Sequence, residues 1–129
     1  MRFVSPASPV SEGWLGRSAE ALEALGLRVE YGTHVYDTDA TIDYLAGTDE
    51  DRLADFNEPL RDPGIRAIIA TRGGKGAYRI ADGLDVEAAR RHPKLVVGFS
   101  EITILHMALL RARPGGPRWN SRRTVHGVR

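Results

Sequence analysis

The chain has 129 residues, of which 42% are hydrophobic and 27% are charged, and its formal net charge is +1. These values are typical of one soluble globular domain and argue against a disordered chain. The near balance of charge gives no general electrostatic case for a nucleic-acid partner. Cysteine is absent, which excludes disulfides, thiol nucleophiles and thiolate metal sites. No apolar run approaches the length of a membrane span and no signal-peptide core follows Met1, so we expect a cytoplasmic protein without a membrane partner.

The first 31 residues predict a βαβ unit. Residues 2–4 read as a short strand, and two prolines exclude regular structure from residues 5–9, here called the proline loop. Apolar residues at helical spacing then predict a helix that opens at Ser11 or Glu12 and ends at Gly26, before an alternating strand over residues 27–31. A βαβ unit implies a parallel sheet with a right-handed crossover. We therefore predict an α/β fold with helices on both faces of the sheet.

Residues 32–47 are polar and ambiguous, and we interpret them as a surface excursion with a short helical turn. The segment holds His34 together with Asp37, Asp39 and Asp43, residue types that can bind a metal. Their spacing is not the regular spacing of a helix or a hairpin that would bring ligands together. We therefore predict neither a metal site nor a cofactor.

The second half of the chain continues the alternation of helices and strands. Thr48 is predicted to cap a helix that stops at residues 62–64, and residues 65–71 are predicted to form a buried strand. Residues 72–76 (RGGKG), here called the glycine loop, follow that strand. Three glycines in four positions indicate a sharp turn or a close approach of the backbone. The loop fits neither GxxxxGK[ST] nor GxGxxG, which disfavours nucleotide binding.

Two short helices are predicted at residues 77–80 and 86–91, and residues 93–110 then read as a strand, a tight turn and a helix. The turn, residues 98–101, carries Ser100 and is here called the serine turn. A serine in this position exposes its hydroxyl beside the free N–H groups of a helix N-terminus, as a nucleophile requires. The alternative is that Ser100 only caps the helix.

Parallel sheets bind ligands above the carboxyl ends of their strands, and the proline loop, the glycine loop and the serine turn all follow strands. In a flavodoxin-like strand order the first, third and fourth strands would be neighbours, and the glycine loop would lie next to Ser100. We assign residues 1–113 to one α/β domain that bears this nucleophile. Residues 114–129, which are rich in arginine, are interpreted as a basic tail or the start of a linker.

Four segments together resemble the LD-carboxypeptidase family of serine peptidases, which includes the microcin C self-immunity proteins. They are SPASP in the proline loop, AGTD followed by RLADFN within residues 46–57, the glycine loop, and GFSEIT at residues 98–103. The resemblance implies a flavodoxin-like, class I glutamine amidotransferase-like fold. It also implies a metal-free serine hydrolase that removes the terminal D-alanine from cell-wall tetrapeptides in the cytoplasm during peptidoglycan recycling. Members of the family are usually dimers.

The resemblance implies roles for individual residues. Ser100 stands where the family has its nucleophile, and the backbone N–H groups of Gly74 and Glu101 stand where it makes the oxyanion hole. Four further residues are candidates for contact with a peptide or muropeptide substrate: Ser8, Arg72, Gly73 and Lys75. The chain departs from the family at Glu101, where Asp is usual, and at Lys75, where an aromatic residue is common. Lys75 would either attract a substrate carboxylate or be solvated.

The acid–base partners of the family, a Glu and a His that complete a Ser-His-Glu triad, belong to a C-terminal domain with which nothing in this chain aligns. His106 lies on a different face of its predicted helix from Ser100, which favours a packed histidine over a base. His126 and Gly127 resemble a His-Gly pair of the family that lies near the site but does not supply the base. His34 and His92 are loop residues without an evident partner.

Serine needs an adjacent base to attack at neutral pH, so we expect Ser100 to be unactivated in this chain alone. One interpretation is that the chain is an N-terminal domain, either a fragment or a truncated product. Another is a non-catalytic binding or assembly module that keeps the fold. A third is another hydrolase or amidotransferase-like protein with a serine on the same kind of turn.

Overall fold

The computed structural model describes residues 1–111. Four short strands form one parallel sheet in the order β2-β1-β3-β4: β1 (Arg2–Val4), β2 (Glu30–Tyr31), β3 (Ala67–Ala70) and β4 (Leu95–Val97). The first, third and fourth strands are therefore neighbours, as in flavodoxin-like order. The predicted α/β fold is confirmed, whereas the predicted tail, residues 114–129, lies outside the described residues.

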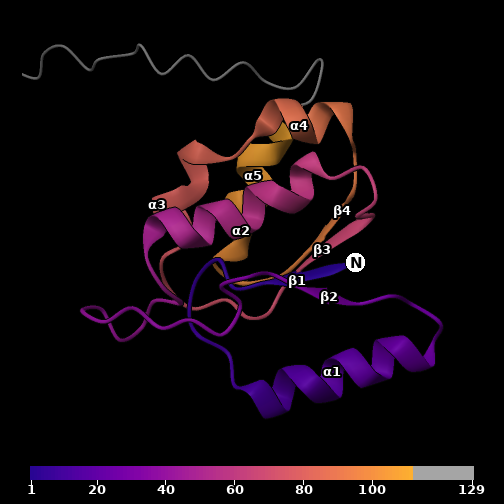
Figure 1. Ribbon diagram of the computed structural model, residues 1–129. Helices are drawn as coiled ribbons and strands as arrows, with labels where there is room; N and C mark the ends of the chain where they lie inside the picture. Colours follow the sequence, from indigo (N-terminus) through magenta and orange to yellow (C-terminus); the bar gives the residue numbers. More distant parts are fainter. Residues whose placement is uncertain (112–129) are drawn as a thin grey trace, which may run out of the picture.

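Helices cover both faces of the sheet (Figure 1). α1 (Glu12–Ala24) lies on one face, and the other face carries α2 (Asp49–Arg61), α3 (Ala77–Ile80), α4 (Val86–Arg91) and α5 (Ile102–Arg111). A 3-10 turn, Ala81–Gly83, follows α3. Consecutive residues of β1 point to opposite faces, because side chains alternate along a strand. Phe3 accordingly packs with Leu15 of α1, and Val4 belongs to the larger cluster with Phe56 of α2.

Two predicted strands are shorter than expected, and one predicted turn is not helical. Arg2 pairs with Glu30, so residues 27–29 have almost no β1 residue beside them, and β2 keeps only two residues. The buried strand predicted at residues 65–71 pairs over Ala67–Ala70. Residues 32–47 contain hydrogen-bonded turns, such as Val35 N–H to Gly32 O at 3.2 Å, but no helix.

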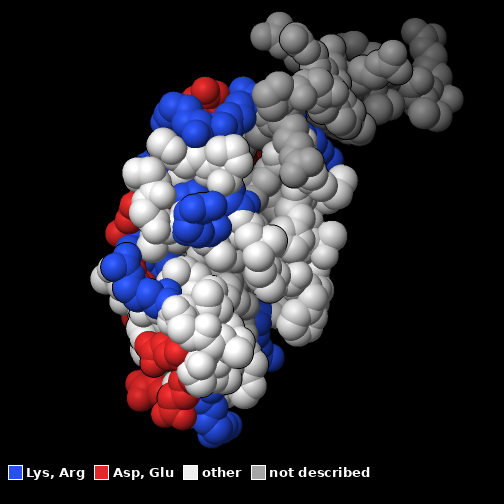
Figure 2. All heavy atoms as spheres, turned by 90° about the vertical axis from the view of Figure 1, so that its right-hand side faces the viewer, with Lys and Arg blue, Asp and Glu red and all other residues white. Residues whose placement is uncertain are grey.

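β4 lies at one end of the sheet and leaves an apolar surface exposed together with α5. This apolar edge consists of the exposed side chains Leu95, Val97, Phe99, Ile104, Met107 and Leu110. A groove of about 740 Å³ lies beside it between α4, β4 and α5. Figure 2 shows charged atoms at the top, the left-hand side, the middle and the bottom of the molecule, with mostly uncharged atoms over much of its right-hand side. Among residues 1–111, no helix has both the length and the apolar character that a membrane span needs.

Candidate active site

Ser100 adopts the left-handed conformation, with φ of 58°, and is the only non-glycine residue within residues 1–111 that has a positive φ. This conformation costs an L-residue about 1–2 kcal/mol, and such strain tends to gather at functional sites. An N-cap residue is instead extended, and α5 begins only at Ile102. The Ser100 hydroxyl is exposed and makes no hydrogen bond within the described residues. The geometry therefore fits an exposed serine on a strained turn and does not fit a helix cap.

The glycine loop lies directly against Ser100. A Cβ placed on Gly73 would lie 2.9 Å from the Cβ and 3.2 Å from the Oγ of Ser100. A Cβ on Gly98 would lie 2.5 Å from Cγ2 of Ile102, so this glycine lets the serine turn fold tightly over α5. Glycine is needed at both positions because a side chain would separate elements that touch. The expected proximity of the glycine loop and Ser100 is confirmed.

Ser8 holds the glycine loop from the other side. Its N–H donates to the carbonyl of Gly73 at 3.2 Å, and its Oγ accepts from the N–H of Lys75 at 3.1 Å. Gly74, between them, has φ of 101°, and a Cβ there would lie 2.1 Å from Ser8 Oγ. Ser8 is buried, so its hydroxyl braces the loop at a position where we expected contact with substrate.

Glu101 connects the serine turn to the far end of the glycine loop. Its Oε2 accepts a hydrogen bond from the N–H of Ala77, the first residue of α3, at 2.8 Å. The side chain at this position is therefore used as well as the backbone. Within residues 1–111, the N–H groups of Gly74 and Glu101 have no acceptor, which leaves both free to donate to a ligand.

Arg52 of α2 ties the loops at this edge of the sheet together, and sequence reasoning did not assign it any role. Its side chain has no exposed surface and pairs with Asp49. The guanidinium donates to the carbonyls of Pro6 at 2.7 Å, Gly76 at 2.9 Å and Gly47 at 3.2 Å. Burial lowers the pKa of Arg52 from its ordinary value, but an arginine stays protonated at any physiological pH.

A signal for Arg52 was present in the sequence. It lies four residues before Phe56 and eight before Leu60, both fully buried, and positions i, i+4 and i+8 share one face of a helix. An arginine on the buried stripe of a helix must find acceptors inside the protein. Backbone carbonyls of neighbouring loops supply them here.

The two cations of the glycine loop, Arg72 and Lys75, have different surroundings. Nη1 of Arg72 donates to the carbonyl of Pro9 at 3.2 Å, so this side chain extends toward the proline loop. Nζ of Lys75 lies over the ring of Tyr44, 5.5 Å from its centroid. Both side chains are exposed.

None of the described histidines hydrogen-bonds to Ser100. His106 lines the groove between α4, β4 and α5, and its buried Nε2 has no partner within residues 1–111. His92 follows the last residue of α4. His126 lies outside the described residues, so its predicted proximity to the site stays a prediction.

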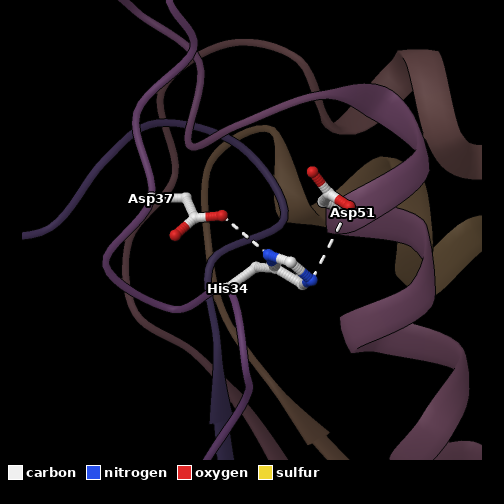
Figure 3. A group of neighbouring side chains, drawn as sticks. All are labelled: His34, Asp37 and Asp51. Carbon is white, nitrogen blue, oxygen red and sulfur yellow. Dashed lines mark hydrogen bonds and ion pairs between the residues drawn. The ribbon is translucent and has the colours of Figure 1, made fainter.

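His34 has partners, contrary to the sequence interpretation. Its Nδ1 lies 2.7 Å from Oδ2 of Asp37, and its Nε2 lies 3.6 Å from Oδ1 of Asp51 (Figure 3). The hydrogen bond to Asp37 raises the pKa of His34, and the nearby charges of Asp51 and Asp55 act in the same direction. Spacing along the chain missed this cluster because Asp51 comes from α2. Each ring nitrogen faces a carboxylate, so the imidazole ring bridges the segment after β2 to α2 (Figure 3).

The comparison with known proteins agrees with this geometry. Residues 1–115 match the LD-carboxypeptidase N-terminal domain family. A Bacillus subtilis protein named probable murein peptide carboxypeptidase is 42% identical over 106 residues, which cover 82% of this chain and 32% of that protein. The murein tetrapeptide carboxypeptidase of Pseudomonas aeruginosa is 36% identical over 112 residues, covering 84% of this chain and 35% of that protein.

A solved structure of an MccF-like protein from Bacillus anthracis superposes with a TM-score of 0.78 at 30% identity, covering 86% of this chain and 34% of that one. The chain thus spans about a third of the length of the relatives it matches. The match over residues 1–115 includes the proline loop, the glycine loop and the serine turn. The chain belongs to the LD-carboxypeptidase family, and it corresponds to the N-terminal domain of that family.

Proposed function

We propose that this chain is the nucleophile-bearing domain of a serine carboxypeptidase that cleaves an L,D-peptide bond, with the terminal D-alanine of cell-wall tetrapeptides as leaving group. The observation that carries the proposal is the conformation of Ser100. Its positive φ lifts the hydroxyl out of the serine turn and against the backbone of Gly73, and neither feature serves a helix cap. The name of the Pseudomonas aeruginosa relative, murein tetrapeptide carboxypeptidase, supports this class of substrate.

In the proposed reaction Ser100 Oγ attacks the scissile carbonyl, and the free N–H groups of Gly74 and Glu101 stabilise the oxygen on which negative charge develops. Donors of this kind are effective only when they are held in place before reaction. The bonds from Ser8 to the glycine loop, from Arg52 to Gly76 and from Glu101 to Ala77 meet that requirement.

The base that activates Ser100 is proposed to come from polypeptide beyond residue 111, as a Glu and a His of a C-terminal domain. Two observations support this division. No described histidine bonds to Ser100, and the relatives are about three times as long as the matched region. The exposed side chains of the apolar edge of β4 and α5 have the apolar character of a surface that further domain structure covers. We further propose that the full-length protein is a cytoplasmic dimer that acts in peptidoglycan recycling.

The test measures release of D-alanine from a murein tetrapeptide by chromatography. We expect no release by the purified 129-residue chain and release by a chimera that joins it to the C-terminal two thirds of the Bacillus subtilis relative. Ser100→Ala in the chimera should abolish release, while circular dichroism confirms that the variant is folded. If the 129-residue chain releases D-alanine and Ser100→Ala abolishes that release, the proposal that the triad is incomplete in this chain is refuted. If the folded chimera cleaves the peptide equally well with Ser100→Ala, the assignment of Ser100 as the nucleophile is refuted.

A second candidate is a binding or assembly module that keeps the fold without chemistry. It is favoured by the lack, within residues 1–111, of a histidine beside Ser100. The coding sequence after Arg129 separates the two. A continuous reading frame into a domain with Glu and His supports the carboxypeptidase, and a natural stop codon supports the module.

A further inference from the structure

Within residues 1–111, Lys75 is the cation of the glycine loop whose head group has neither an acidic partner nor a hydrogen bond. Arg79, four residues further on, donates through Nε to both carboxylate oxygens of Asp49, at 2.8 and 3.0 Å. Arg72 donates to the carbonyl of Pro9. Within residues 1–111, no carboxylate forms an ion pair with Lys75. Its ammonium is therefore available to an anion that comes from outside the described chain.

The backbone of Lys75 is fixed on both sides. Its N–H is bound by Ser8 Oγ at 3.1 Å, and the following carbonyl, that of Gly76, accepts from the buried guanidinium of Arg52 at 2.9 Å. Both flanking glycines have positive φ, 101° at Gly74 and 111° at Gly76. The direction in which the side chain leaves the loop is therefore set by the fold.

The end of the side chain is held as well. Nζ lies 5.5 Å from the centroid of the Tyr44 ring, within the distance at which an ammonium is attracted to an aromatic face. Tyr44 belongs to the segment between β2 and α2, so two different loops converge on this charge. A lysine on a random surface position has no such restraint, and part of the entropy cost of fixing it is already met here.

We propose that Lys75, held by Tyr44, binds the terminal carboxylate of the peptide that is cleaved at Ser100, and so makes the site specific for a C-terminal residue with a free carboxylate. This inference rests on the proposed function. Lys75 follows Gly74, whose N–H is the proposed oxyanion donor, and Gly73 touches Ser100. In a carboxypeptidase substrate a single Cα separates the carboxylate from the scissile nitrogen, so a cation on the oxyanion loop suits its recognition.

The test compares the binding of two ligands to the 129-residue chain. Binding is measured from changes in the backbone amide chemical shifts in NMR spectra. The ligands are acetyl-L-lysyl-D-alanine and its C-terminal amide, which differ only in the carboxylate, at concentrations of about 10 mM to allow for millimolar affinity. We expect the acid to shift the amides of residues 73–76 with an affinity about fivefold higher than the amide. Lys75→Met should remove that preference, and Lys75→Arg should keep it.

Three further variants sharpen the result. Tyr44→Leu should reduce the preference and Tyr44→Phe should keep it, because the ring face and not the hydroxyl holds the ammonium. Arg66→Met removes one positive charge just before β3, at the opposite end of that strand, and should leave the preference unchanged. If the acid and the amide bind equally well at residues 73–76, a peptide site exists but Lys75 does not recognise the carboxylate, and this inference is overturned. If neither ligand shifts residues 73–76 or 100–102, the proposed function and this inference are both overturned.

Discussion

The substitution Gly74→Ala tests how closely the proline loop holds the glycine loop. Gly74 has φ of 101°, and its Cβ would lie 2.1 Å from the Oγ and 2.6 Å from the Cβ of Ser8. The conformation costs an L-residue about 1–2 kcal/mol. Forcing Ser8 aside adds about 1–3 kcal/mol, which includes the loss of its hydrogen bond to Lys75. We expect the free energy of unfolding to fall by about 2–5 kcal/mol.

Urea unfolding of the 129-residue chain, followed by circular dichroism, measures this loss. With a denaturant slope of about 2 kcal/mol/M, the midpoint should fall by roughly 1–2.5 M. Ser8→Gly removes the atoms that clash, because the Ser8 Cα is 3.7 Å from the new Cβ. The double variant should therefore recover the steric part of the loss and keep the conformational part, a coupling of about 1–3 kcal/mol in a double-mutant cycle.

Gly16→Ala is the matched control for Gly74→Ala. Gly16 lies in α1 and a Cβ there would meet nothing within 4 Å, so the change should raise stability by about 0.5–1 kcal/mol. An unchanged urea midpoint for Gly74→Ala would refute the close approach of Ser8 to the glycine loop. A cycle without coupling would show that the cost is conformational and that the predicted clash is absent.

Three further changes test the rest of the site. Ser100→Gly should raise stability by about 1 kcal/mol in the same urea experiment because it relieves the positive φ, whereas Ser100→Ala should not, and equal midpoints for the two would argue against strain. Arg52→Met should cost about 3–5 kcal/mol because it leaves buried carbonyls without a donor, while the control Arg61→Met, at an exposed ion pair, should hardly move the midpoint. The raised pKa of His34 means that its stabilising contribution is complete below about pH 6.5 and is lost as the pH rises through the folded-state pKa. Wild type should therefore lose stability relative to His34→Gln between pH 6 and pH 9, and parallel pH profiles would contradict the ionic bridge.

Local patterns in the sequence were sufficient to predict a parallel sheet with helices on both faces. The alternation of Phe3 and Val4 between two cores, the helical spacing in α2 and the Thr48 cap all depend on neighbours in the chain. The serine turn was predictable for the same reason, since strand, glycine, serine and helix occur within a few residues. What pattern alone left open was whether Ser100 caps its helix, and the backbone conformation of one residue decides that.

Contacts between distant segments could not be predicted in this way. Asp51 reaches His34 from α2, and the carboxylate of Glu101 reaches Ala77 across 24 residues. The length of β2 depended on where β1 begins beside it. Each of these outcomes is set by tertiary packing, which one-dimensional spacing does not contain.

Residues 1–111 supply contacts that hold the strained serine. Gly73 touches Ser100 directly, and Arg52 and Glu101 both hold the C-terminal end of the loop that carries Gly73. None of these contacts requires a base beside the hydroxyl. The geometry of the site is therefore expected to persist in this chain whether or not a C-terminal domain is attached, and activation of Ser100 becomes a separate step. A lack of turnover by the 129-residue chain would then reflect the lack of an activating base and not a disordered site. A strained turn persists only where its surroundings determine it, and those surroundings are present in this chain.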